Sequence, residues 1–275
     1  MLRLGWFSTG RGEGSRGLLS VVADAIQHNK LEAEIAFVFC NREAGEDSGS
    51  DEYMSLVNSY DIPLFTLSSQ RFRRDQAAPQ FASIRESYDK EVMALLAGQK
   101  SDLNVLAGYG LIFGTEMAKQ HVSLNLHPAT PDGPIGTWQQ VIWELIENSA
   151  AESGTMIHIA TKDLDRGPPA SYVSFPIHGH GFDDLWREVS GQDVNTLKKQ
   201  HGEKFTLLQR IRQEGLRRER PLLLETLKAL TSGRLRVVNH QVVDAEGAPT
   251  APICLNNEVD HILTARCRVE IQIVI

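Results

Sequence analysis

Two polar residues with catalytic potential stand two positions apart in the stretch Asn125-Leu126-His127-Pro128. If this stretch ends a β-strand, both side chains face the same side, because residues two apart in a strand share a face. An Asn amide can donate a hydrogen bond to a developing oxyanion, and a His can donate a proton or polarise a carbonyl. The alternative is a capping Asn beside a core His, and the stretch alone favours neither interpretation.

A carboxylate that could assist this pair follows later in the chain. Asp165 lies just past the apolar run Gly154–Ala160, with Gly167 and Pro168 soon after it, which suits a side chain held in a fixed loop. An Asp close to His127 would favour the imidazolium form and fix the tautomer of the ring. The alternative is a turn Asp, which is common near glycine.

A glycine loop near the amino terminus could bind an anion. Gly12, Gly14 and Gly17 match G-x-G-x-x-G between an apolar run and a helical pattern. Such glycines let the backbone approach a phosphate, and a helix N-terminus supplies N–H donors. A dinucleotide interpretation would continue with Arg42, placed to meet a 2′-phosphate, although Gly12 follows the predicted strand late for that motif. The alternative is a generic strand-to-helix turn.

The elements that must position these residues alternate along the chain. Strands are predicted at 2–8, 34–40, 62–67, 103–107, 122–126, 154–160 and 170–175; helices are predicted at 18–27, 52–60, 83–96, 138–148 and 209–230, the last broken near Pro221. This alternation predicts an α/β fold, a three-layer, Rossmann-like arrangement with a mostly parallel sheet and helices on both faces. Such sheets hold their ligands at the carboxyl ends of the strands, where Asn125 and His127 would lie.

Composition limits the classes of function. The chain has 275 residues, 41% hydrophobic and 23% charged, so it can bury a sizeable core and is not a disordered protein. A net charge of -7 disfavours broad binding to a nucleic-acid backbone, and no apolar run is long enough to span a bilayer. Three widely spaced cysteines indicate neither a disulfide framework nor a metal cluster. We expect a cytoplasmic protein without metal, nucleic-acid or membrane partners.

Taken together, the motifs resemble the folate-dependent formyltransferase family over most of positions 1–250. The matching pieces, in order, are the glycine loop with Ser15, Arg85-Glu86-Ser87-Tyr88-Asp89, Leu106-Ala107-Gly108-Tyr109, Asn125-Leu126-His127-Pro128, Gly154-Thr155-Met156-Ile157-His158, Leu164-Asp165-Arg166-Gly167-Pro168 and Ser232-Gly233-Arg234-Leu235. The resemblance implies the family's fold and formyl transfer from 10-formyltetrahydrofolate to a primary amine. It favours glycinamide ribonucleotide as the acceptor, in de novo purine biosynthesis.

The resemblance also implies roles for individual residues. Asn125, His127 and Asp165 would be catalytic, with His158 near the proton path. The folate would lie against Leu106, Tyr109, Leu111, Ile112, Phe113, Ala160, Leu164 and Asp165. The phosphorylated acceptor would bind Gly12, Glu13, Gly14, Ser15, Arg16, Arg85 and Glu214.

The departures from the family pattern concern the acceptor side. Arg16 stands where the family usually has Asn, the glycine loop is two residues longer, and about twenty extra residues fall between Phe182 and Gly202. A formyltransferase for another amine, such as an amino sugar nucleotide, is therefore the nearest rival. The methionyl-tRNA branch is disfavoured by the acidic charge and by the 40 residues that follow Leu235. A formyltetrahydrofolate hydrolase is disfavoured because the chain starts at the first strand.

A different class of function remains open. A nonenzymatic nucleotide-binding module or an NADP-binding protein would use the glycine loop alone. We expect one catalytic domain over residues 1–253, with an insertion near 182–202, and a tail over 254–275. The end of the tail, Val269–Ile275, is strand-like and could pair with a sheet edge or with a partner chain in a homodimer.

Overall fold

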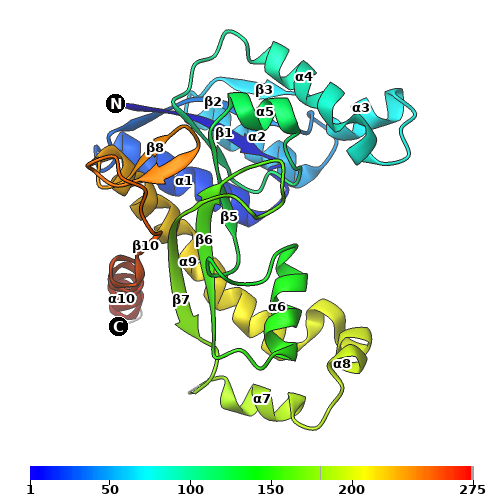
Figure 1. Cartoon of the computed structure of the whole chain (residues 1–275), viewed down its shortest axis with the longest axis vertical. Helices are drawn as coiled ribbons and strands as arrows, with labels where there is room; N and C mark the ends of the chain where they lie inside the picture. Colours follow the sequence, from blue (N-terminus) through cyan, green and yellow to red (C-terminus); the bar gives the residue numbers. More distant parts are fainter. Residues whose placement is uncertain (180, 274–275) are drawn as a thin grey trace. The chain divides into compact units, whose positions relative to one another are not determined.

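The computed structural model describes residues 1–179 and 181–273, with side chains described up to residue 265 (Figure 1). The chain divides into two compact units. The first contains Met1–Leu126, His158–Pro168 and Leu227–Pro249, and the second contains His127–Ile157, Pro169–Thr226 and Thr250–Ile275. Each unit is described by itself below.

The first unit is a parallel α/β structure. Its strands are β1 (Leu2–Ser8), β2 (Ala33–Cys40), β3 (Leu64–Thr66), β4 (Leu103–Leu106) and β5 (Ser123–His127), and its helices are α1 (Glu13–Gln27), α2 (Ser48–Ser59), α3 (Ser69–Asp75), α4 (Arg85–Leu95) and α5 (Thr115–Gln120), with a 3-10 turn at Phe81–Ile84. The strands pair in the order β5-β4-β1-β2-β3, and every pair is parallel. A hairpin of β8 (Arg236–Val238) and β9 (Gln241–Val243) completes the unit.

The strand order places helices on both faces of this sheet. Crossovers between parallel strands are right-handed, so α1 and α2, which lead away from β1 in one direction, share one face. Helices α4 and α5 lie in the connections that lead to β4 and β5, on the other side of β1. They therefore cover the opposite face of the sheet. This arrangement confirms the predicted α/β fold with a mostly parallel sheet.

One face of the sheet carries an aromatic core. The Phe7 ring is edge-on to Tyr109 at 5.7 Å and to Phe113 at 5.5 Å between centroids, and it also contacts Phe37 and Phe39. Such pairs contribute about 0.5–1.5 kcal/mol each beyond the area they bury. The segment between β4 and α5 is therefore anchored to β1 and β2 by its own ring side chains.

The second unit contains the later helices. Its elements are α6 (Trp138–Glu147), β6 (Glu152–Ile159), β7 (Pro169–Pro176), α7 (Asp183–Val189), α8 (Val194–His201), a 3-10 turn at Gly202–Lys204, α9 (Thr206–Thr231), β10 (Ile253–Cys254) and α10 (Asn256–Ile273). Strand β10 pairs parallel with β7. The weakly patterned segment 182–202 forms α7 and α8, and its Phe182 and Leu197 are buried in a core that includes Trp143 and Phe205.

Two sequence-based predictions about helices are wrong. Helix α9 continues through Pro221 without a break. Apolar residues on both sides of the proline are buried, including Ile211, Leu222 and Leu223, and their packing outweighs the lost backbone hydrogen bond. The strand-like end Val269–Ile275 is helical as far as Ile273 in α10, and residues 274–275 lie outside the described part.

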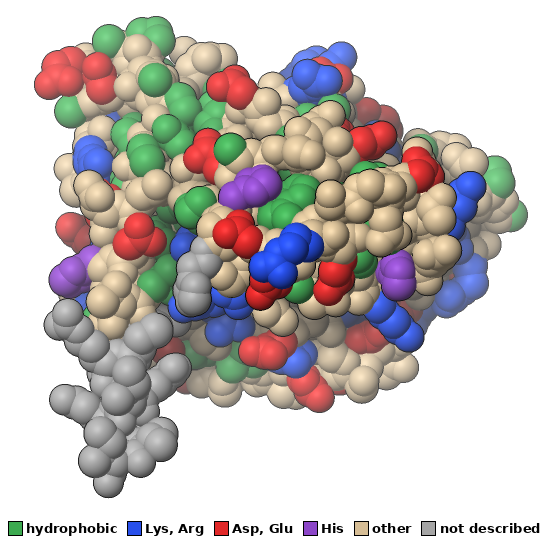
Figure 2. Space-filling model, turned by 90° about the horizontal axis from the view of Figure 1, so that it is seen from below, with side chains coloured by type: hydrophobic (Ala, Val, Ile, Leu, Met, Phe, Trp, Pro, Cys, Tyr) green, Lys and Arg blue, Asp and Glu red, His purple; other side chains and the backbone are tan. Residues whose placement is uncertain are grey.

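Charge on the surface is mixed. On the face drawn in Figure 2, Lys and Arg side chains lie beside Asp and Glu side chains over the coloured area. Among the described residues, no helix combines the length and the apolar character needed to cross a membrane.

Candidate active site

Three polar side chains of the first unit meet after β5 and β6. The Asn125 amide Nδ2 lies 3.1 Å from His158 Nε2 and 3.5 Å from Asp165 Oδ1. His158 Nε2 lies 3.6 Å from the same carboxylate oxygen, and both of these side chains are almost fully buried. The structure thus joins an amide, an imidazole and a carboxylate whose positions in the sequence are far apart.

The hydrogen bonds of His158 define its neutral tautomer. Its Nδ1 lies 3.0 Å from the Ile159 carbonyl oxygen, which can only accept, so Nδ1 carries the proton. Nε2 of the neutral ring is then an acceptor for the Asn125 Nδ2–H. If the ring gains a second proton, Nε2–H instead becomes a donor that faces Asp165.

The loop that carries Asp165 has a constrained backbone. Asp165 has φ 52°, in the left-handed region that Asp tolerates better than most residues. The Ile159 N–H donates to the Pro168 carbonyl at 2.9 Å, which folds the loop back onto the end of β6. A Cβ on Gly167 would lie 1.7 Å from the Ile159 carbonyl oxygen, so only glycine fits there. This close approach holds the Asp165 loop in place.

His127 is described within the second unit. It is 2% exposed, and its Nε2 lies 2.8 Å from the Pro134 carbonyl oxygen. Because a carbonyl only accepts, Nε2 carries the proton and Nδ1 is the unprotonated nitrogen of the neutral ring. The loop after β5 therefore orients this ring.

The residues expected to contact a folate differ in exposure. Four of them are buried in the first unit, namely Leu106, Tyr109, Phe113 and Ala160. Leu111 and Ile112 are half-buried, and Leu164 is 45% exposed. Burial raises the pKa of Tyr109 well above its ordinary value, so this hydroxyl stays neutral. The side chains that can present apolar surface to a ligand are those of Leu111, Ile112 and Leu164.

The glycine loop begins helix α1. Gly12 is the N-cap in an extended conformation, so α1 begins at Glu13, earlier than predicted. The first N–H groups of the helix have no partners within it. Arg16 does not point over this end of the helix, because its Nη1 lies 3.2 Å from Glu52 and 3.3 Å from the Gly49 carbonyl oxygen.

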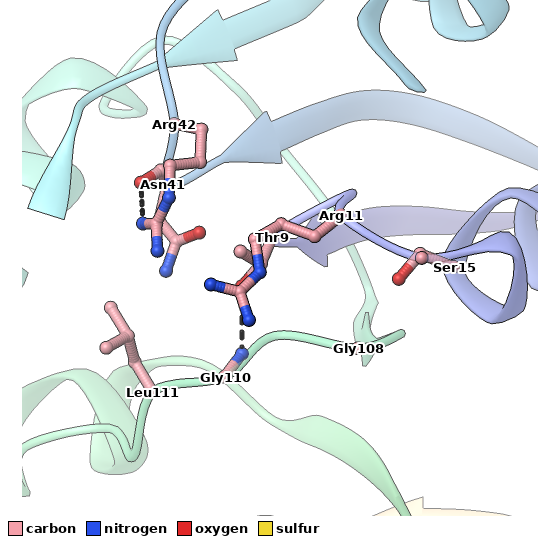
Figure 3. Close-up of a pocket in the computed structure, with 9 residues that line it drawn as sticks. Thr9, Arg11, Ser15, Asn41, Arg42, Gly108, Gly110 and Leu111 are labelled. Atoms are coloured by element: carbon pink, nitrogen blue, oxygen red, sulfur yellow. Dashed lines mark hydrogen bonds between the residues drawn. The ribbon is translucent and has the colours of Figure 1, made fainter. Parts of the chain in front are cut away.

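A cavity of about 250 Å³ lies beside the glycine loop (Figure 3). Its walls are Thr9, Arg11, Gly12, Ser15, Asn41, Arg42, Gly108, Gly110 and Leu111. The side chains of Asn41 and Arg42 enter from the end of β2, and that of Arg11 enters from the loop after β1. Of the residues expected to bind a phosphorylated acceptor, Gly12 and Ser15 line this cavity.

Glu214, expected to contact the acceptor, lies in α9 within an arginine cluster. Its oxygens lie 3.1 Å from Arg210 and Arg217 and 2.7 Å from Arg218. Burial would raise the pKa of Glu214, but the hydrogen bond from Arg218 and the nearby positive charges outweigh it and lower the pKa. Glu214 is therefore ionised and held by arginines at neutral pH.

The remaining acceptor candidate, Arg85, begins α4. Its Nε is buried and has no hydrogen-bond partner among the described residues.

Among the polar side chains of the cavity, the sequence assigned no site role to Arg11 or Asn41 and only a dinucleotide role to Arg42. Asn41 belongs to none of the motifs quoted above, and Arg11 precedes the first glycine of the G-x-G-x-x-G match. Arg42 was considered only for a dinucleotide. The signal available for Asn41 and Arg42 was their place directly after a strand that neighbours β1, where ligands of parallel sheets bind. No group of His, Cys, Asp or Glu suited to a metal ion occurs within the described residues.

Comparison with known proteins gives consistent results. A family model described as formyl transferase matches residues 12–187. Phosphoribosylglycinamide formyltransferase of Escherichia coli is 28% identical over 188 residues, which are 66% of this chain and 78% of that protein. The structure of phosphoribosylglycinamide formyltransferase from Coxiella burnetii, in complex with CHES, has a TM-score of 0.63 at 20% identity, covering 92% of this chain and 98% of that one.

A related fold occurs in a structure with a different activity in its name. Formyltetrahydrofolate deformylase from Pseudomonas syringae has a TM-score of 0.59 at 19% identity, covering 88% of this chain and 65% of that one. The family match includes β1's glycine loop, β5 and the Asp165 loop, and it spans more than half of the chain. The chain therefore belongs to the formyl transferase family of enzymes.

Proposed function

We propose that this protein transfers a formyl group from 10-formyltetrahydrofolate to the primary amine of glycinamide ribonucleotide, a step of de novo purine biosynthesis. The observation that carries the proposal is the cluster of Asn125, His158 and Asp165. Its amide and carboxylate are the groups that formyl transfer to an amine requires, a donor for an oxyanion and an acceptor for a proton. The E. coli relative carries the name of this activity.

The chain's residues would act in sequence. The acceptor amine attacks the formyl carbon, whose oxygen becomes an oxyanion held by the Asn125 amide and by a protonated His127. Asp165 takes the proton that the amine loses, through a water molecule. The bond between the carbon and N10 of the folate then breaks, and N10 receives a proton, so the products are the formamide and tetrahydrofolate. His158 holds the Asn125 amide in place.

The apolar residues of the first unit fit a folate ring. Leu164 is 45% exposed, and a flat ring against it would bury that apolar surface. The rings of Tyr109 and Phe113 are engaged in the aromatic core, and the Gly108 carbonyl and the Gly110 N–H already bond to Thr9. A folate would meet the remaining backbone groups of this segment.

The identity of the formyl acceptor is supported by fewer observations than formyl transfer itself. The N-terminus of α1 and the cavity beside it suit a phosphate, and glycinamide ribonucleotide has one. An amino sugar nucleotide also has an amine and phosphates, and it remains the rival acceptor.

A second candidate is hydrolysis of the formyl-folate, with water in place of the amine. It is favoured by the match of 88% of this chain to the Pseudomonas syringae deformylase structure. The same three residues would serve it, because water must also lose a proton.

One assay separates these functions. Purified protein is given 10-formyl-dideazafolate with glycinamide ribonucleotide, with a panel of amino sugar nucleotides, or with no acceptor. We expect deformylation that depends on glycinamide ribonucleotide and yields its formamide. Formylation of an amino sugar nucleotide alone would mean that the acceptor is such a nucleotide and not glycinamide ribonucleotide. Formate release without any acceptor would establish the hydrolase. No reaction under all three conditions would contradict the catalytic proposal.

A further inference from the structure

The ring of His127 is held by a backbone carbonyl later in the same loop. Its Nε2 lies 2.8 Å from the Pro134 carbonyl oxygen, and the residue is 2% exposed. This hydrogen bond can form only while Nε2 carries a proton, so it stabilises one of the two neutral tautomers. Nδ1 is then the nitrogen that gains or gives up a proton during turnover. The position of one carbonyl therefore decides which ring nitrogen can do chemistry.

The segment that carries this carbonyl is fixed on its amino-terminal side by tight packing. Ala129 is 1% exposed in the core of the second unit, and the Gly133 N–H donates to the Thr130 carbonyl oxygen at 2.9 Å. A Cβ on Gly154 in β6 would lie 2.6 Å from the Thr130 methyl carbon, so this methyl group packs directly on the strand backbone. The chain is thus held in place as far as Gly133.

On the carboxyl-terminal side, the segment depends on the start of helix α6, whose N-cap is Thr137. Ile135 is 40% exposed, so its side chain contributes little packing. Gly136 has φ 114°, which favours glycine, and a Cβ there would lie 2.6 Å from Gln140 Oε1. The Gln140 side chain therefore lies against the backbone that links Pro134 to the helix.

A capping box joins this backbone to the helix. The Thr137 N–H donates to Gln140 Oε1 at 2.8 Å, and the Gln140 N–H donates to Thr137 Oγ1 at 3.3 Å. Helix α6 is itself anchored, because its residues Val141, Trp143 and Ile146 are buried. The Gln140 side chain thus ties the end of the loop to an element that is fixed in the core of the second unit.

We propose that Gln140 is a positioning residue for His127. Through the capping box it holds the Pro134 carbonyl where that oxygen accepts from Nε2, and so it fixes the orientation and the tautomer of the ring. Gln140 is exposed and needs no contact with a substrate for this role. The inference rests on the proposed function in taking His127 as a donor to the oxyanion. With Nε2 committed to Pro134, that donor is Nδ1–H of the protonated ring.

Two variants of Gln140 test the proposal. Gln140→Ala removes the acceptor for the Thr137 N–H, so we expect kcat to fall about tenfold, while KM for the folate and for the acceptor changes little. Gln140→Glu keeps an acceptor oxygen, since Glu serves in a capping box as Gln does, and should retain the wild-type kcat. Because the side chain is exposed, both proteins should fold.

Asp193→Ala is the matched control for a lost helix cap. Asp193 is the N-cap of α8 in the same unit, and its carboxylate accepts from the Thr196 N–H at 2.9 Å. Its removal should lower the melting temperature about as much as Gln140→Ala does, because each variant loses one cap. It should leave kcat unchanged, because α8 does not belong to the segment between His127 and α6.

The state of the ring can be measured without turnover. In heteronuclear NMR spectra of histidine-labelled protein, protonated and unprotonated ring nitrogens differ in chemical shift, and His127→Ala assigns the signals. At mildly alkaline pH we expect Nε2–H in the wild type and in Gln140→Glu, and a mixture of the two tautomers in Gln140→Ala. A loss of stability alone does not change the tautomer of the folded protein, so Asp193→Ala should give the wild-type signals.

Several results would overturn the proposal. They are an Nδ1–H tautomer in the wild type, an unchanged kcat in Gln140→Ala, and a fall of kcat in Asp193→Ala as large as in Gln140→Ala. Failure of Gln140→Glu to retain kcat would show that the capping box is not the cause. A tautomer that depends on Gln140 in a protein that formylates no acceptor would leave the positioning role standing while the proposed function fails.

Discussion

Asn125 Nδ2 lies 3.1 Å from Nε2 of His158, a ring whose other nitrogen is tied to the Ile159 carbonyl. The ring is thereby fixed as an acceptor, and the amide must present an N–H to it. The second N–H of the same amide lies at the longer distance of 3.5 Å from Asp165 Oδ1, and this is the N–H that must turn to the oxyanion in the proposed mechanism. In the proposed mechanism His158 is therefore a positioning residue, which would affect catalysis through the orientation of Asn125.

Removing the carboxylate of Asp165 should reduce turnover strongly. Asp165→Asn keeps the shape but cannot accept the amine proton, so we expect kcat to fall by about 10²–10⁴, the usual contribution of a general base. KM for the folate should change little. Asp163→Asn, an exposed carboxylate of the same loop, is the control and should retain activity. A kcat within a factor of three of wild type for Asp165→Asn would exclude the proposed role.

His127→Ala should abolish turnover while folate binding largely remains. The imidazole is proposed to donate to the oxyanion, an interaction present only in the transition state, so kcat should fall and ground-state affinity should not. Steady-state kinetics and fluorescence titration with 10-formyl-dideazafolate measure the two quantities. His28→Ala, on the exposed end of α1, controls for a general effect of losing a histidine. Parallel losses of folate affinity and of kcat would point to a structural role for His127.

Asp89 should make stability depend on pH. Burial raises its pKa from 3.8 to about 6, against the hydrogen bond from the Gly114 N–H, which lowers it. Between these pKa values the folded state binds more protons than the unfolded state, so this group's contribution to the free energy of unfolding falls as pH rises. Asp89→Asn cannot ionise, so the wild type should lose about 2 kcal/mol relative to it between pH 4 and pH 7.

Urea unfolding of both proteins at the two pH values measures this difference. Glu91→Gln, an exposed carboxylate on the same helix α4, should show no such pH-dependent difference from wild type. The opposite sign for Asp89→Asn would mean that the carboxylate is stabilised when ionised, through the N–H groups at the start of α5.

Many elements of both units could be predicted because their signals are local. The strand 2–8 is confirmed at both ends, since the mostly apolar run from Leu4 to Phe7 marks a buried parallel strand. Helix α6 begins where expected because Thr137 and Gln140 form a capping box. The continuity of α9 through Pro221 could not be predicted, because it depends on packing from other parts of the chain.

The site was only partly accessible to sequence reasoning. Asn125, Asp165 and His158 were singled out, but their contacts join positions 33 and 40 residues apart and depend on tertiary structure. The ion pair of Arg16 with Glu52 and the hydrogen bond of Arg42 to Ser69 likewise join residues far apart in the sequence. No local pattern tells which arginine finds a carboxylate.

Gly167→Ala should test whether the close approach of the loop to β6 supports catalysis. The added Cβ would lie 1.7 Å from the Ile159 carbonyl oxygen, a backbone atom that cannot rotate away, so the loop with Asp165 must shift. We expect a loss of stability of about 2 kcal/mol or more and a fall in kcat of about a hundredfold, since small displacements of catalytic groups have large effects. Gly98→Ala, where the new Cβ meets nothing within 4 Å, is the control. Thermal unfolding and kcat are measured on both variants. A Gly167→Ala protein that is destabilised yet keeps full kcat while folded would show that Asp165 does not depend on this contact, and would separate the loop's structural role from its catalytic one.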